Sequence, residues 1–151
     1  MTSLTTSLTT SRDRLLVFSH PLSPEAGIQV PAGTVRDNET PEDAVLREAR
    51  EETGLTALTL VGLLGRQRFD VGPFGRDEIH ERWFFHLTCD DETSDQWRHG
   101  EHDPSDAPGE VIPFDLFWAD HPNGVPSLIA DHDRFLPDLI KRLGLETVQP
   151  T

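Results

Sequence analysis

Residues 40–54 carry the start and stop signals of a single helix, and they constrain the fold more than any other segment. Thr40 can cap the helix N-terminus, Pro41 suits the first helical position, and Asp43 lies where the acid of a capping box stands. Gly54 suits the left-handed residue that often ends a helix. The sequence therefore predicts a helix of about three turns over residues 42–53.

Three carboxylates share one face of this expected helix, because Glu48, Glu51 and Glu52 are spaced at i, i+3 and i+4. Like charges this close repel each other, so either solvent or a cation must compensate them. Oxygen ligands on a rigid element suit Mg²⁺ or Mn²⁺, which also accept phosphate oxygens. Val45 and Ala49 lie on a different side, where we expect the helix to contact the core.

The rest of the chain alternates apolar runs with turn-forming segments. Strands are predicted at residues 14–20, 27–35, 57–71, 79–89 and 111–118, a turn at 71–77 and a second helix at 127–143. Residues 90–110 contain eight acids and are expected to form an exposed loop. The order predicts one α/β (α+β) domain over residues 12–145, with flexible tails at 1–11 and 146–151.

Composition excludes several functions. The formal net charge of -14 argues against binding to a nucleic acid polymer or to an anionic membrane. No apolar run approaches the roughly 20 residues of a membrane span. Cys89 is the only cysteine, so no internal disulfide and no thiolate metal cluster can form. With no secretory signal in the sequence, we expect a cytoplasmic protein.

Residues 33–55 read GTVRDNETPEDAVLREAREETGL, and their spacing resembles the Nudix box. The matching fixed positions are Gly33, Glu39, Arg47, Glu48, Glu51, Glu52 and Gly54. Ala49 fills an apolar position of the box with a smaller side chain than usual. The resemblance implies an α/β/α sandwich around a mixed sheet. It also implies a hydrolase that acts on a nucleoside diphosphate linked to another moiety.

The same resemblance implies roles for individual residues. Glu48, Glu51 and Glu52 would bind Mg²⁺ or Mn²⁺ together with the backbone carbonyl of Ala32. Arg47 would pair with Glu39 and orient these ligands. The bound metal would screen the diphosphate charge and lower the pKa of an attacking water.

The general base stays open at this point, because members of the family differ in the acid that they use. Glu48 and Glu51 are candidates within the box. The candidates outside it are Glu78, Glu81, Glu101 and Glu110. Glu110 has the most suggestive position, directly before a predicted strand.

Substrate contacts are expected from the middle of the chain. Four arginines could hold phosphates, namely Arg66, Arg68, Arg76 and Arg82. Phe74 is a candidate for stacking on a base, as are Trp83, Phe85 and Trp118. Alternation along the strand directs at least one of residues 83–85 into the core. His99, His102 and Asp103 resemble zinc spacing only superficially, because a third strong ligand is missing.

The segment that precedes the box indicates a substrate class. Val30-Pro31-Ala32-Gly33 resembles the lead-in of ADP-ribose and nucleotide-sugar pyrophosphatases, and Pro73 only approximately matches a later proline of those enzymes. We therefore expect a nucleotide-sugar or ADP-ribose-like substrate. A (deoxy)nucleoside triphosphate and a non-catalytic nucleotide-binding role are the alternatives. Homodimers are frequent in the family, so a homodimer is a further possibility.

Overall fold

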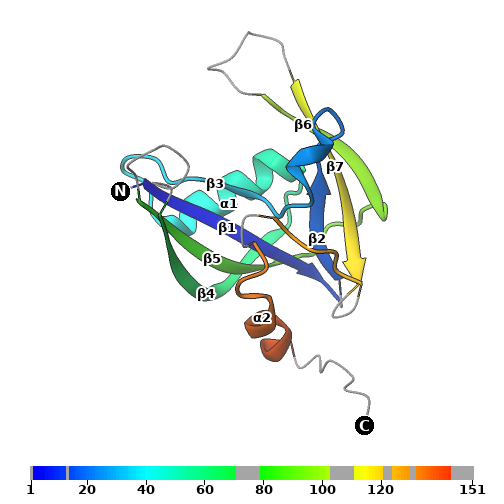
Figure 1. Cartoon of the computed structure of the whole chain (residues 1–151). Helices are drawn as coiled ribbons and strands as arrows, with labels where there is room; N and C mark the ends of the chain where they lie inside the picture. The colour runs from blue at the N-terminus through cyan, green and yellow to red at the C-terminus, as the bar shows by residue number, and fades with distance from the viewer. Residues whose placement is uncertain are drawn as a thin grey trace.

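The computed structural model describes residues 2–12, 14–70, 79–102, 111–120, 124–129 and 132–143 (Figure 1). The strands are β1 (Thr2–Ser11), β2 (Arg14–Ser19), β3 (Ala32–Thr34), β4 (Leu58–Asp70), β5 (Ile79–Cys89), β6 (Gln96–His102) and β7 (Val111–Asp120). The α-helices are α1 (Pro41–Thr53) and α2 (Leu136–Arg142), and a short 3₁₀ helix spans Pro24–Ala26. Across these ranges, no helix has the length and apolar character needed to cross a membrane.

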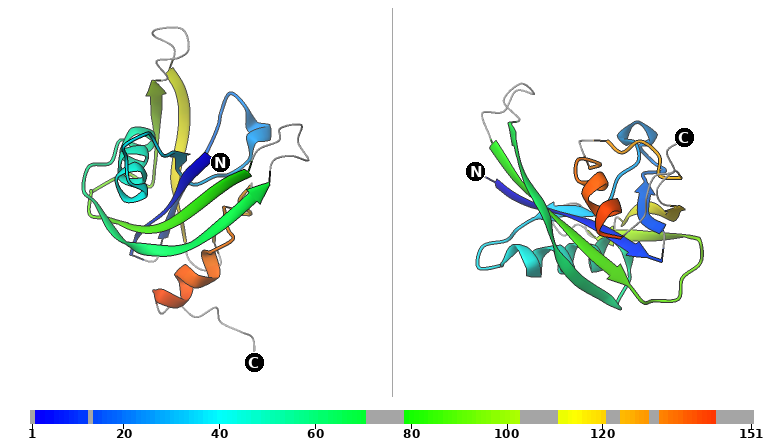
Figure 2. Two further views of the ribbon diagram at one scale, coloured as in Figure 1. Left: turned by 90° about the vertical axis from the view of Figure 1, so that its left-hand side faces the viewer. Right: turned by 90° about the horizontal axis from the view of Figure 1, so that it is seen from below.

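All seven strands belong to one mixed sheet, as Figures 1 and 2 show. The order is β4-β5-β1-β2-β7-β6, and β3 pairs with β1 outside this path. β1 runs parallel to β5 and antiparallel to both β3 and β2. Its first half pairs with β3, and its last two residues pair with β2. β1 therefore joins the β4-β5 half of the sheet to the rest.

The expected flexible tail over residues 1–11 is wrong, because Thr2–Ser11 forms β1 inside the sheet. Threonine is β-branched and favours strands, although its hydroxyl lowers the apparent hydropathy of the segment. Thr5, Leu8 and Thr9 have exposed fractions of 0%. The Thr10 hydroxyl lies 2.8 Å from Nε2 of His86 on β5, so a neighbouring strand satisfies this one polar side chain.

Each face of the sheet carries its own hydrophobic core, and one helix covers each core (Figure 2). The core under α1 consists of Leu16, Phe18, Val45, Ala49, Leu55, Leu58, Phe85, Leu87, Cys89, Phe114, Leu116 and Trp118. The core under α2 consists of Leu8, Leu15, Val17, Val30, Leu64, Phe84, Ala119, Leu128 and Leu139. Phe84 and Phe85 point to opposite faces, as strand alternation requires. The expected sandwich around a mixed sheet is confirmed.

Two further expectations are wrong in part. Residues 96–102 are not loop but form the edge strand β6, which pairs with β7 from Gln96↔Phe117 to His102↔Val111. The second helix is confined to Leu136–Arg142. Pro137 lies at its start, a position that proline tolerates because it lacks the N–H that the first turn leaves unpaired anyway.

The remaining expectations are met to different degrees. β3 covers only three residues of the strand predicted at 27–35, and Ile28 and Gln29 form isolated bridges instead. The turn predicted at 71–77 lies outside the described residues. The helix predicted at 42–53 is confirmed as α1.

Candidate active site

The ends of α1 are formed by the residues that the sequence indicated. The Thr40 hydroxyl accepts a hydrogen bond from the Asp43 N–H at 3.1 Å, and Pro41 begins the helix. Gly54 adopts φ 77°, a left-handed conformation that costs glycine little, and its N–H donates to the Arg50 carbonyl. These caps fix where the helix begins and ends, and therefore where its carboxylates lie.

Arg47 links α1 to the loop that precedes it. Its Nε and Nη2 donate to the two Glu39 oxygens at 2.8 and 2.9 Å, and Nη2 also donates to the Thr34 carbonyl at 3.0 Å. Glu39 in turn accepts the Arg36 N–H. These hydrogen bonds lower the pKa of Glu39 to about 2. The bidentate pair holds the loop in one position relative to the helix.

The other side of the Arg47 guanidinium contacts the carboxylates. Nη1 donates to Glu48 at 2.7 Å and to Glu51 at 3.3 Å. The Glu48 side chain is only 13% exposed, and burial raises the pKa of its carboxyl while Arg47 opposes that rise. Arg47 therefore compensates part of the repulsion on this face.

Gly33 lies directly against Glu48. A Cβ added at Gly33 would lie 2.1 Å from Cδ of Glu48 and 2.4 Å from its Oε2. Any side chain at this position would therefore displace the carboxylate. The present position of the Glu48 carboxylate depends on glycine here.

The three box carboxylates share one helix face but differ in how far they are exposed to solvent. Glu52 is 7% exposed, and its Oε2 accepts the Ala32 N–H at 3.0 Å. Glu51 has a side chain that is 43% exposed. Glu52 thus fastens the end of β3 to the helix, whereas Glu51 faces solvent.

The donor chemistry of this cluster suits a hard divalent cation. Glu48, Glu51 and Glu52 offer only oxygen ligands on one rigid element. In the described part of the chain, no three Asp, Glu, His or Cys side chains are arranged to enclose a cation. The Arg47 guanidinium bridges Glu48 and Glu51 instead. Glu51 is exposed enough to turn from Arg47 towards a cation.

Strand β6 supports the C-terminal end of α1, a role that the sequence did not suggest. Trp97 Nε1 donates to the Thr53 carbonyl at 3.0 Å, and His99 Nε2 lies 3.0 Å from the Glu51 carbonyl. The last carbonyls of a helix have no partner within it, so these side chains complete them. The only signal was Trp97, a large aromatic within an acidic segment.

His132 supports the approach to Ala32 from the opposite face of the sheet. It is 7% exposed, and its Nδ1 accepts the Val30 N–H at 3.2 Å. Burial, followed by the positive charge of Arg82, lowers the pKa of His132 to about 4. The imidazole is therefore neutral at pH 7 and acts as a hydrogen-bond acceptor.

Acidification should consequently destabilise the fold through His132. The unfolded chain binds this proton with a pKa near 6.5, whereas the folded chain binds it near 4, so the unfolding free energy falls as the pH drops between these values. The expected loss is about 3 kcal/mol. Chemical denaturation at several pH values measures it. His132→Asn keeps an acceptor for Val30 but does not titrate, so its slope in this window should be shallower. An identical slope would contradict the assignment.

The structure brings only some of the other candidates together. Arg66 on β4 forms an ion pair with Glu81 on β5. Arg68 lies exposed two residues further along β4, and Glu101 lies in β6. Arg82 is 9% exposed and points to the α2 face beside His132, away from the carboxylates. Four candidates lie outside the described residues, namely Phe74, Arg76, Glu78 and Glu110.

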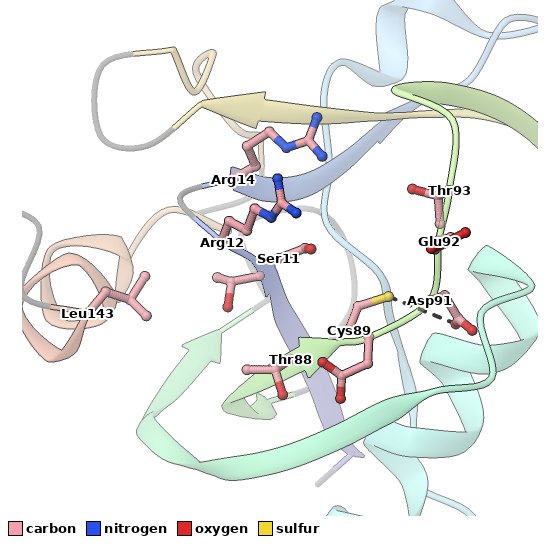
Figure 3. Close-up of a pocket in the computed structure, with 11 residues that line it drawn as sticks. Ser11, Arg12, Arg14, Thr88, Cys89, Asp91, Glu92, Thr93 and Leu143 are labelled. Carbon is pink, nitrogen blue, oxygen red and sulfur yellow. Dashed lines mark hydrogen bonds between the residues drawn. The ribbon is translucent and has the colours of Figure 1, made fainter.

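A pocket of about 780 Å³ lies at the other end of β1, as Figure 3 shows. Arg12 of the β1-β2 connection, Arg14 at the start of β2, and Asp91 and Glu92 after β5 contribute to its lining. Arg14 is already paired with Asp95 at 2.9 Å. None of its lining residues belongs to the segment 33–55, so this pocket is separate from the carboxylate cluster.

The structure thus combines a mixed sheet between two helices with a carboxylate cluster on α1 that is hydrogen-bonded to Arg47. The family model of the NUDIX domain matches residues 4–139, and the chain therefore belongs to the Nudix hydrolase family. No match was found among curated proteins.

Solved structures show the same fold at low sequence identity. A NUDIX-family hydrolase from Clostridium perfringens is 21% identical, with 95% of this chain and 96% of that chain covered and a TM-score of 0.60. The E. coli ORF135 protein is 20% identical, with coverage of 99% and 95% and a TM-score of 0.65. The E. coli dihydroneopterin triphosphate pyrophosphohydrolase is 17% identical, with coverage of 90% and 95% and a TM-score of 0.62.

Proposed function

We propose that this Nudix protein is a Mg²⁺- or Mn²⁺-dependent pyrophosphohydrolase. Its substrate would be a nucleoside diphosphate linked to another moiety, and its setting the cytoplasm. The arrangement of Arg47 between Glu39 and the carboxylates of Glu48 and Glu51 carries the proposal. Arg47 offsets the negative charge of Glu48 and Glu51 through hydrogen bonds. The carboxylate oxygens stay on the helix as possible ligands for a cation.

Glu48, Glu51 and Glu52 would hold the metal, together with the Ala32 carbonyl. When bound, the cation supplies charge neutralisation for the diphosphate and acidifies a water. The chain itself fixes the position of these groups. Glu52 fastens β3, Gly33 makes room for Glu48, and Arg47 orients the cluster.

Among the described box carboxylates, Glu51 is the best placed to accept the proton of an attacking water. Its side chain is 43% exposed, whereas Glu48 and Glu52 are largely buried and hydrogen-bonded. A general base must reach the proton that it removes, so exposure favours Glu51. Outside the box, Glu110 remains the first of the candidates, ahead of Glu78, Glu81 and Glu101.

For the substrate we favour an ADP-ribose-like or nucleotide-sugar compound, because of the Val30-Pro31-Ala32-Gly33 lead-in. A nucleoside triphosphate is the alternative. Both substrates contain the diphosphate bond that such a site would cleave.

Hydrolysis assays with chromatographic product analysis test the proposal. The panel comprises ADP-ribose, nucleotide sugars and nucleoside triphosphates, each with Mg²⁺ or Mn²⁺ and with a chelator. Chelation should abolish turnover, and added metal should restore it, because the oxygen-only cluster has no other means of neutralising a diphosphate. Equal rates with and without chelator would contradict metal dependence. No turnover of any substrate would favour a nucleotide-binding role.

A further inference from the structure

Four neighbouring strands place a row of residues beside the carboxylate cluster, on the α1 face. Gly33 of β3 is paired with Thr5 of β1, Thr5 with Trp83 of β5, and Trp83 with Arg66 of β4. Partners in register point to the same face, and Trp83 packs against the core under α1. Gly33 contacts Glu48, so the row leads away from the candidate active site. Three strand spacings of about 4.8 Å span about 14 Å, the scale of an extended nucleotide.

Arg66 is the last residue of this row, and its planar guanidinium is held in place by two neighbours. Its guanidinium carbon lies 4.0 Å from the centroid of the Trp83 ring, and the guanidinium forms an ion pair with Glu81. The Arg66 side chain is nevertheless 51% exposed. One face of the guanidinium is therefore covered by the indole, while the side chain still presents surface to solvent.

The same row contains polar atoms without partners. Thr5 Oγ1 and Trp83 Nε1 are buried and have no hydrogen-bond partner among the described residues. Buried polar groups are normally satisfied, so two unsatisfied atoms in one row point to ordered water that completes them. They lie between Gly33 and Arg66 in strand register, and Thr5 itself is fully buried.

We propose that the exposed face of the Arg66 guanidinium, backed by Trp83, stacks on the nucleobase of the substrate. The inference rests on the proposed function and assigns the nucleoside end of the substrate to the β4-β5 side of the site. The diphosphate would then lie towards Glu48 and Glu51. Guanidinium planes and aromatic rings both stack on bases, and such stacking tolerates different bases.

The surroundings of Arg66 favour a base over a phosphate. Glu81 already neutralises its charge, which weakens attraction for an anion but leaves the planar surface intact. Trp83 keeps this plane in place, so little side-chain freedom is lost on stacking.

Equilibrium binding of AMP and of ribose 5-phosphate tests whether the stacked Arg66–Trp83 pair, here called the platform, binds a nucleobase. Both carry one phosphate, but only AMP carries a base, and neither requires hydrolysis. By calorimetry, the wild type should bind AMP about tenfold more tightly than ribose 5-phosphate. Arg66→Lys keeps the charge but removes the plane, so AMP affinity should fall about tenfold while ribose 5-phosphate affinity stays unchanged.

Arg98→Lys is the matched control, because Arg98 is a 63% exposed arginine that pairs with Asp115 on a different strand. It should bind both compounds as the wild type does. Unchanged AMP affinity in Arg66→Lys would overturn the proposal, and an equal loss for both compounds would assign Arg66 to phosphate instead. Hydrolysis is scored separately, so base-dependent binding without turnover would uphold the platform and reject only the proposed function.

Discussion

Replacing Gly33 with alanine should lower kcat about a hundredfold or more while the protein remains folded. The new methyl group would require the space of the Glu48 carboxylate, whose Cδ lies 2.1 Å from the ideal Cβ position. Glu48 would have to move away from Arg47 and from its neighbours in the cluster. A displacement of about 1 Å in a catalytic group commonly costs about 10²-fold in rate. Steady-state kinetics with the best substrate, together with circular dichroism, measures the effect.

Gly62→Ala provides the matched control for this experiment. A Cβ at Gly62 meets only the end of Arg142, at 3.9 Å, which is an ordinary contact. Both variants add one methyl group to a strand glycine, but only Gly33→Ala should lose activity. Comparable activity of the two variants would show that Glu48 does not need its present position.

Replacing Glu51 with glutamine should reduce hydrolysis about a thousandfold or more. The variant keeps the shape of the side chain but removes a charge that we assign to the metal, and such a cation supplies several kcal/mol of transition-state stabilisation. The fold should be unaffected, because the Glu51 side chain is 43% exposed and its contact with Arg47 is long, at 3.3 Å. Mn²⁺ binding followed by electron paramagnetic resonance should weaken in parallel with the rate.

Glu42→Gln is the control for charge, because Glu42 is an exposed acid in the first turn of the same helix. Its rate and Mn²⁺ affinity should match those of the wild type. If Glu51→Gln retained both properties, the cation would have to be held elsewhere. If it bound Mn²⁺ normally but lost turnover, Glu51 would act on the attacking water rather than on the metal.

The sequence was most informative where structure depends on neighbouring residues. The limits of α1 follow from Thr40, Pro41 and Gly54, whose effects act within one turn of the helix. The spacing of the box acids likewise predicted a shared cluster, because helical geometry alone brings such positions together. These signals need no knowledge of the rest of the chain.

Elements that depend on distant partners were not predictable in this way. β1 is polar by composition and becomes a strand only because β5, β3 and β2 supply its hydrogen bonds. β6 was hidden by the acids around it and depends on β7. The burial of Glu52 depends on the approach of Ala32, and that of Arg82 on its strand register, neither of which a single segment reveals.

The position of β1 also governs the order in which the molecule can assemble. Residues 2–10 pair in parallel with residues 80–88, so this contact must close a loop of almost eighty residues. The β4-β5 and β6-β7 pairs are closer along the chain and can form earlier. Long-range pairing of this kind slows folding, because chain entropy is lost before the contacts compensate for it. Because β1 also pairs with β3, its contact with β5 joins the Ala32–Gly33 backbone to the β4-β5 half of the sheet.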